Sequence, residues 1–540
     1  MAFAVYWATV AAGRKAGIWR KVNLTFYGPV MMLRTRKGRW IFEALARNGR
    51  FWRACGTFSV YLTVCASVAL MAFMVWAILS TGSGHGLPSG VIMSGPGQPD
   101  LGIVAIVPYI ILGLGTAVLV HESLHGILSV AGNIKVESMG VLLALVPIGA
   151  FVEPNESELS RASTMTRLRL FSAGPAANLI VALLLMVILI GFLGPAAKPI
   201  SSGAIVTQVG SGSPAEVSGI SVWSEVTGVG GERISTSADF QNISFNYPGE
   251  LTSINATYQT RHIMLALPGG MVVTSVTDGP AFNAGIRPGM IISRFDDMVI
   301  HNHQELNSAV ENASRAQPVN VTVLRLGDET TAGVSWFVAD EKISTINMTS
   351  KWIYYCLHYP SLNKEEYKNV SFMGASVSPF GLSVDDPEHV LQPITHPFAG
   401  AKGVSGIAAA TLGYVALPFY GNSPVASPVA NLYVPSGALS FLPGDLYWIL
   451  VNSFYWIFWV NLMLGLTNAL PALPMDGALV LRDLLRSLAR KVGARLTGFD
   501  LTIGRKPYSD RQIDRFMVLV TVLVFAMIIY LLVWQMFGPF

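Results

Sequence analysis

The stretch VHESLHG, residues 120–126, contains two histidines four residues apart and a glutamate beside the first. Residues at positions i and i+4 share one face of a helix, so His121 and His125 can bind a single metal ion. Glu122 projects from a different direction on the same turn, where its carboxylate can take a proton from metal-bound water. Zinc lowers the pKa of such water toward neutrality. The pattern therefore predicts a hydrolytic zinc site with Glu122 as general base.

A third ligand is needed, because a catalytic zinc ion normally has three protein ligands and one open position. The candidate is Asp476, the only acid in NLMLGLTNALPALPMDGALVL, residues 461–481. Pro471 and Pro474 must break the helix before it, and irregular backbone at membrane depth is tolerated where it lines a cavity. Asn468, in the same stretch, is a candidate for hydrogen bonding to the substrate or to a developing oxyanion. The alternative for Asn468 is a hydrogen bond between helices.

These residues belong to a strongly apolar chain of 540 residues, of which 52% are hydrophobic and only 13% charged. Soluble domains are closer to one quarter charged, so the composition favours a membrane protein, and no nucleic-acid partner is expected. The eighteen residues before His121 carry no charge. Ionisable side chains inside a membrane are costly and usually functional. The predicted metal site therefore lies in a membrane-spanning helix.

Five apolar segments have the roughly 20 residues that a helix needs to cross a bilayer, and they are 56–80, 103–130, 170–194, 446–470 and 514–536. A sixth candidate, 398–420, is rich in Gly and Ala and only weakly apolar. It is expected to be a loop on the membrane surface. The third and fourth spans enclose a long segment, 195–445.

The distribution of basic residues predicts the orientation of these spans in a cell membrane. Residues 1–55 hold eleven Lys and Arg against one acid, and the loops 131–169 and 471–513 are also rich in Lys and Arg. The loop 81–102 has none. We therefore expect a cytoplasmic N-terminus without a cleavable signal peptide, with the segment 195–445 and the C-terminus outside the cell.

The outer segment contains an internal repeat. GAIVTQVGSGSPAEVSGI and GMVVTSVTDGPAFNAGI share a predicted strand, a Pro-Ala turn, a short helix and a Gly-Ile pair. They resemble tandem PDZ domains of the protease-associated type, over 195–267 and 268–345. PDZ domains bind extended peptides or C-termini at a sheet edge. The alternative is that the pair only excludes bulky partners. Residues 346–445 carry no such pattern and are expected to lie outside the cell or on the membrane surface.

The motifs together are similar to one known family. His-Glu-x-x-His in one span, GPAANL at the start of the next, the PDZ-like pair and NALPALPMDG in a late span resemble the site-2 protease family of intramembrane zinc metalloproteases. The resemblance implies one zinc ion held by His121, His125 and Asp476, with Glu122 as base. It also implies hydrolysis of a peptide bond within a transmembrane helix of a membrane-anchored substrate.

Two further segments match this family less directly. Residues 136–154, VESMGVLLALVPIGAFVEP, resemble its membrane-dipping β-hairpin, which would pair with an unwound substrate strand. The family's Leu-Asp-Gly is replaced by Met475-Asp476-Gly477, which keeps the carboxylate ligand.

The sequence therefore predicts a polytopic α-helical membrane protein with two extracytoplasmic, β-rich, PDZ-like domains. Its parts are a basic cytoplasmic or interfacial segment 1–55, three helices with the zinc-binding helix in 56–194, the outer segment, and two helices with the third ligand in 446–540. Two other classes of protein stay open: a transporter with a polar site inside the membrane, and a scaffold or chaperone with a silent protease core.

Overall fold

The computed structural model of the chain describes residues 24–27, 30–82, 103–143, 147–259, 261–313, 315, 317–329, 335–358, 364–420, 425, 427–497 and 510–537. Residues 1–23 of the predicted N-terminal segment and most of the predicted loop 81–102 lie outside the described residues. The described chain forms two compact units. One contains the residues up to 82, 103–189 and 452–537, and the other contains 190–451.

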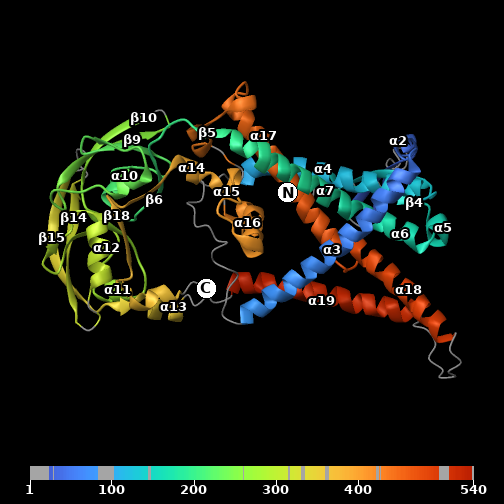
Figure 1. Cartoon of the computed structure of the whole chain (residues 1–540). Coiled ribbons are helices and arrows are strands. Elements are labelled where there is room, and N and C mark those ends of the chain that lie inside the picture. Colours follow the sequence, from blue (N-terminus) through green and yellow to red (C-terminus); the bar gives the residue numbers. More distant parts are fainter. Residues whose placement is uncertain are drawn as a thin grey trace. The chain divides into compact units, whose positions relative to one another are not determined.

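Five helices in the described part of the chain are long and apolar enough to cross a membrane, which confirms the predicted number. They are α3 (Gly49–Gly82), α4 (Ile103–Ala131), α7 (Ala173–Ile188), α17 (Gly444–Ala469) and α19 (Asp510–Phe537) (Figure 1). A π-helical turn (Leu189–Leu193) and α8 (Gly194–Ala196) prolong α7. The first helix begins at Gly49 instead of residue 56, because a helix can continue through polar residues beyond the apolar core of a bilayer.

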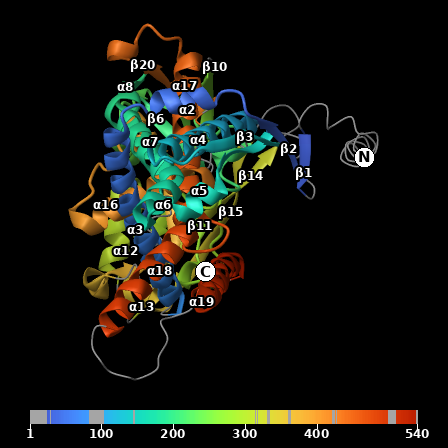
Figure 2. The same cartoon turned by 90° about the vertical axis from the view of Figure 1, so that its right-hand side faces the viewer.

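Shorter elements of the first unit surround these helices. They are α2 (Arg39–Leu45), α5 (Glu156–Arg161), α6 (Thr164–Phe171) and α18 (Asp476–Thr497). The side chains of Asn155 and Ser163 cap α5 and α6 by accepting hydrogen bonds from backbone N–H groups three residues later. In both views α6 lies beside α18 (Figure 2), and the two helices are in contact.

A four-stranded antiparallel sheet completes the first unit. Its order is β1 (Leu24–Tyr27), β2 (Val30–Thr35), β3 (Val136–Leu143) and β4 (Pro147–Pro154). The hairpin β3–β4 falls in the segment 136–154. Strands β1 and β2 come from the basic N-terminal segment, in which we had predicted no strand. Strand β4 is an edge strand, so one side of its backbone is not paired within this sheet.

The second unit contains two copies of one order of elements. The first copy runs through β6 (Ala204–Val209), α9 (Pro214–Val217), β7 (Glu225–Val229), β8 (Glu232–Arg233), α10 (Ser237–Gln241), β9 (Leu251–Tyr258) and β10 (Arg261–Pro268). The second copy runs through β11 (Met271–Val276), α11 (Pro280–Asn283), β12 (Ile291–Phe295), β13 (Met298–Val299), α12 (His303–Asn312), β14 (Val319–Glu329) and β15 (Ser335–Ile346). The internal repeat in the sequence is therefore a repeat of structure.

Each copy is completed by a strand from far along the chain. Strand β18 (Ala375–Pro379) pairs with β11, and β19 (Leu382–Asp385) pairs with β6, so each of the two six-stranded sheets has an edge strand from the segment 346–445. One hydrophobic cluster contains buried residues of both copies together with Phe380 and Leu382. The segment that carried no repeat pattern thus belongs to the β-rich core.

The rest of the second unit is made of short elements. They are β5 (Ala197–Pro199), β16 (Thr349–Ser350), α13 (Lys351–His358), a 3₁₀ turn (Glu365–Asn369), β17 (Ser371–Phe372), α14 (Pro387–Val390), α15 (Gln392–Thr395), α16 (Gly403–Ala416), three further 3₁₀ turns (Leu417–Tyr420, Val429–Leu432 and Gly437–Leu439) and β20 (Tyr433–Pro435). The candidate 398–420 is therefore largely helical and not a loop. Helix α16 has 14 residues, about 21 Å at 1.5 Å per residue, which is short of the roughly 30 Å hydrocarbon core.

Candidate metal centre

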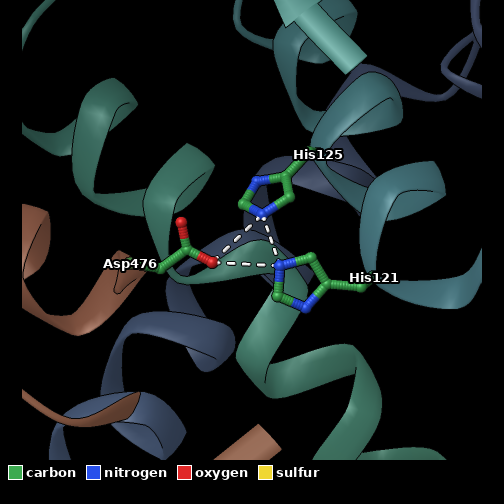
Figure 3. Close-up of side chains that lie close together, drawn as sticks. All are labelled: His121, His125 and Asp476. Atoms are coloured by element: carbon green, nitrogen blue, oxygen red, sulfur yellow. Dashed lines mark hydrogen bonds and ion pairs between the residues drawn. The ribbon is translucent and has the colours of Figure 1, made fainter. Parts of the chain in front are cut away.

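Three side chains from two helices point toward one another in the first unit (Figure 3). His121 and His125 lie on α4, and Asp476 is the first residue of α18. Oδ2 of Asp476 lies 3.1 Å from Nε2 of His121 and 3.3 Å from Nε2 of His125. The two Nε2 atoms are 3.2 Å apart. The structure thus brings together the three residues that the sequence suggests as ligands.

The donor set and its spacing fit zinc. Ligand atoms at the usual 2.0–2.1 Å from a tetrahedral zinc ion lie about 3.3 Å from one another, close to the distances observed. Oδ2 of Asp476 is buried and has no hydrogen-bond partner among the described residues. A Cβ atom at Gly174 would press on the ring of His121 and on Nε2 of His125. The glycine therefore keeps free the space beside the ring nitrogens.

A backbone contact sets the orientation of His125. Its Nδ1 lies 2.8 Å from the carbonyl oxygen of Leu170, at the end of α6. A carbonyl oxygen only accepts hydrogen bonds, so Nδ1 must carry the proton. In the neutral ring Nε2 then keeps its lone pair, which is the state that a metal ligand requires.

The break between α17 and α18 places Asp476. Helix α17 ends at Ala469 and α18 begins at Asp476, so Pro471 and Pro474 lie in the break, as predicted. Gly477 lies so close to the Ala469 carbonyl group that a Cβ atom would collide with it. The chain is therefore tightly turned at the third ligand.

Two contacts outside the break hold it in position. The backbone N–H of Leu473 donates to Oγ1 of Thr521 on α19, at 3.0 Å. Nε of Arg167 on α6 forms a 2.7 Å ion pair with Asp483, which lies two turns into α18 and is 2% exposed. Because a buried carboxylate is costly without a partner, this pair fixes α18 against α6.

Glu122 contacts the edge strand of the small sheet. Its Oε2 accepts a 2.8 Å hydrogen bond from the backbone N–H of Val152 on β4. The side chain is not one of the three grouped ligands. The sequence did not predict this contact, because nothing local to either segment indicates it. The structure therefore links the predicted base to the hairpin.

Asn468, the predicted oxyanion donor, is half-buried near the end of α17. Its Nδ2 donates to the carbonyl oxygen of Leu464, one turn earlier in the same helix, at 3.1 Å. This hydrogen bond lies within one helix, unlike the bond between helices that was the alternative. A role for Asn468 toward substrate stays a prediction.

The motif GPAANL contributes more than the small residues that allow close packing. Besides Gly174, it supplies Asn178, which is fully buried on α7. Nδ2 of Asn178 lies 3.2 Å from Nδ1 of His121. An asparagine four residues after a motif glycine is one turn further along the same helical face, and this spacing is the signal that could have indicated the contact.

The helices and this side-chain group define a polytopic membrane protein with a centre suited to a metal ion. A comparison with protein families matches residues 109–501 to Peptidase family M50, which is the site-2 protease family of zinc metalloproteases. The match covers most of the chain and all of the residues discussed above. The chain belongs to Peptidase family M50.

Curated relatives share shorter segments with the chain. It is 36% identical over 165 residues to an uncharacterized protein of Methanocaldococcus jannaschii, which covers 30% of this chain and 43% of that protein. It is also 36% identical over 63 residues to a probable periplasmic serine endoprotease, DegP-like, of Pseudomonas putida, which covers 12% of this chain and 13% of that protein. The chain thus spans less than half the length of these relatives.

Proposed function

We propose that the protein is a zinc-dependent endopeptidase that hydrolyses a peptide bond within a transmembrane helix of a membrane-anchored protein. The observation that carries this proposal is the group His121, His125 and Asp476, assembled from a membrane-length helix and from the broken backbone after another. Membership of family M50 supports a metalloprotease. A transporter would explain the buried polar group but not a carboxylate adjacent to the ligands.

The chain's own residues supply binding, positioning and proton transfer. A zinc ion held by the three ligands supplies Lewis acidity and a water molecule of near-neutral pKa. Glu122 takes a proton from the attacking water and delivers it to the departing amine. The amide group of Asn468 donates to the developing oxyanion once it turns from its partner Leu464.

The hairpin presents the substrate to this centre. A helical substrate has its amide groups in internal hydrogen bonds, so the bond to be cut must first be unwound. The free edge of β4 offers backbone groups to an extended strand. Because Val152 on this strand already bonds to Glu122, a substrate strand docked here lies beside the base.

Replacing Val152 by proline tests the link between hairpin and base. Proline has no N–H, so the hydrogen bond to Glu122 is lost, whereas an edge strand tolerates proline at an outward-facing N–H. We expect Val152→Pro to lower kcat by roughly 10-fold or more, on the scale of a misplaced general base, with zinc content unchanged. Val152→Ala, which keeps the N–H, is the matched control and should retain most activity. Equal rates for both variants would show that this contact does not position the base.

The β-rich unit serves partner selection in this proposal. We place it outside the cell, with the N-terminus in the cytoplasm, on the distribution of basic residues given above. The edge strands β18 and β19 offer backbone to extended peptides or new C-termini of membrane-anchored substrates. A size filter that excludes large ectodomains is the second role that the same unit can perform.

The proposed activity can be tested in cells. Membranes containing Asp476→Ala should accumulate short membrane-anchored fragments, because this variant lacks one zinc ligand. With the wild-type chain the same proteins should yield new termini that map inside their transmembrane segments. Mass-spectrometric mapping of membrane peptides distinguishes the two cases. Identical peptides in both membranes, or new termini only outside the spans, would argue against cleavage inside the membrane.

A further inference from the structure

Asn178 holds a position that the hydrolytic mechanism does not use. It is fully buried on α7, and its Oδ1 has no hydrogen-bond partner among the described residues. Its Nδ2 lies 3.2 Å from Nδ1 of His121, on the side of the ring away from Asp476. A buried polar group without a partner is costly, so this arrangement requires an explanation.

The hydrogen bonds as they stand fit a centre without metal. An amide N–H of Asn178 donates to Nδ1 of His121, so the neutral ring carries its proton on Nε2. That Nε2–H can donate to Nε2 of His125, 3.2 Å away, which keeps its lone pair because the proton is on Nδ1. In this tautomer Nε2 of His121 has no lone pair for a metal ion.

Metal binding requires the opposite tautomer. His121 must then carry its proton on Nδ1, and this N–H needs an acceptor in a position without water. A half-turn of the Asn178 amide brings Oδ1 to the place of Nδ2 and supplies that acceptor. Nitrogen and oxygen of an amide are nearly the same size, so the turn needs no extra space.

We propose that Asn178 is a positioning residue that selects the metal-binding tautomer of His121. When the centre is loaded, Oδ1 of Asn178 accepts the hydrogen bond from Nδ1–H of His121. Leu170 does the same for His125 through its backbone carbonyl. The two ligands from α4 are therefore oriented by two different elements, α6 and α7, and only the contact from α7 can be changed by substitution.

This inference rests on the zinc site of the proposed function, and zinc affinity tests it without reference to activity. The full chain is purified in detergent, and zinc binding is measured by competition with a chelator of known affinity. Asn178→Leu keeps the approximate shape but removes the acceptor, so we expect an affinity 10- to 100-fold weaker, as for other outer-sphere partners. Asn178→Asp keeps an acceptor in either orientation and should bind zinc within a few-fold of wild type or more tightly.

A control separates this effect from the loss of a buried amide as such. Asn461 on α17 is also fully buried, and its Nδ2 bonds to the carbonyl oxygen of Ile457 in its own helix. Asn461→Leu should leave zinc affinity unchanged.

Two results for Asn178 would overturn the inference: wild-type affinity in Asn178→Leu, or equal weakening in Asn178→Leu and Asn178→Asp, which would indicate a packing role. Absence of zinc binding by the wild-type chain would instead overturn the proposed function.

Discussion

Glu122→Gln is expected to give a folded, zinc-containing protein that cannot cleave. Glutamine keeps an oxygen that can accept the hydrogen bond from Val152 N–H, so the contact with β4 survives. It cannot take a proton from water, and loss of a general base typically costs 10²- to 10⁴-fold in rate. Because Glu122 is not one of the three grouped ligands, metal content should be unaffected. The measurements are zinc stoichiometry by metal analysis and cleavage of a reconstituted membrane substrate.

Glu122→Asp is the graded control for this prediction. It retains a carboxylate but draws it back by one methylene group, so activity should lie between that of wild type and that of Glu122→Gln. Cleavage at the wild-type rate by Glu122→Gln would place the base elsewhere. A loss of zinc in that variant would mean that Glu122 supports the ligands instead of the proton transfer.

Gly174→Ala is expected to abolish both zinc binding and activity, although it adds only one methyl group. That methyl group would occupy the space beside the ring nitrogens of His121 and His125, where its contacts would be far shorter than real Cβ contacts. The rings belong to a helix packed against α7, so they cannot move without separating the two helices. The expected result is a zinc content near that of Asp476→Ala, measured on protein purified in detergent.

Gly115→Ala is the matched control, because Gly115 lies on the same helix as the two histidines and a Cβ there meets no atom within 4 Å. Alanine at an open helical position stabilises by up to about 1 kcal/mol relative to glycine, so this variant should keep its zinc and unfold at the same or a higher temperature. Full zinc occupancy in Gly174→Ala would show that the histidine rings have more room than the structure gives them.

The ligands and the spanning helices could be predicted from the sequence because their signals are local. His121 and His125 declare themselves by a four-residue spacing, and each span by a run of apolar residues. The break before Asp476 follows from Pro471 and Pro474. Such patterns reflect helix periodicity and bilayer thickness, which do not depend on the rest of the fold.

The contacts that orient these residues could not be predicted in the same way. Val152 meets Glu122, and Asn178 meets His121, only because distant elements pack together. A backbone N–H or a carbonyl, such as that of Leu170, is present at every position and leaves no mark in the sequence. Likewise, the residues of β18 and β19 alternate like many short strands, and nothing in them names the sheets that they join.

The exchange of strands in the second unit has a consequence for the way the protein is made. During synthesis the first copy emerges with its own last strand ending at Pro268, yet its sheet lacks an edge until β19 has left the ribosome. The second copy waits for β18. Pairings so distant along the chain form slowly, because loop closure precedes the contacts that reward it. Both copies, joined in one hydrophobic cluster, therefore reach their final form nearly together, and a chain cut short after β15 would leave both unfinished.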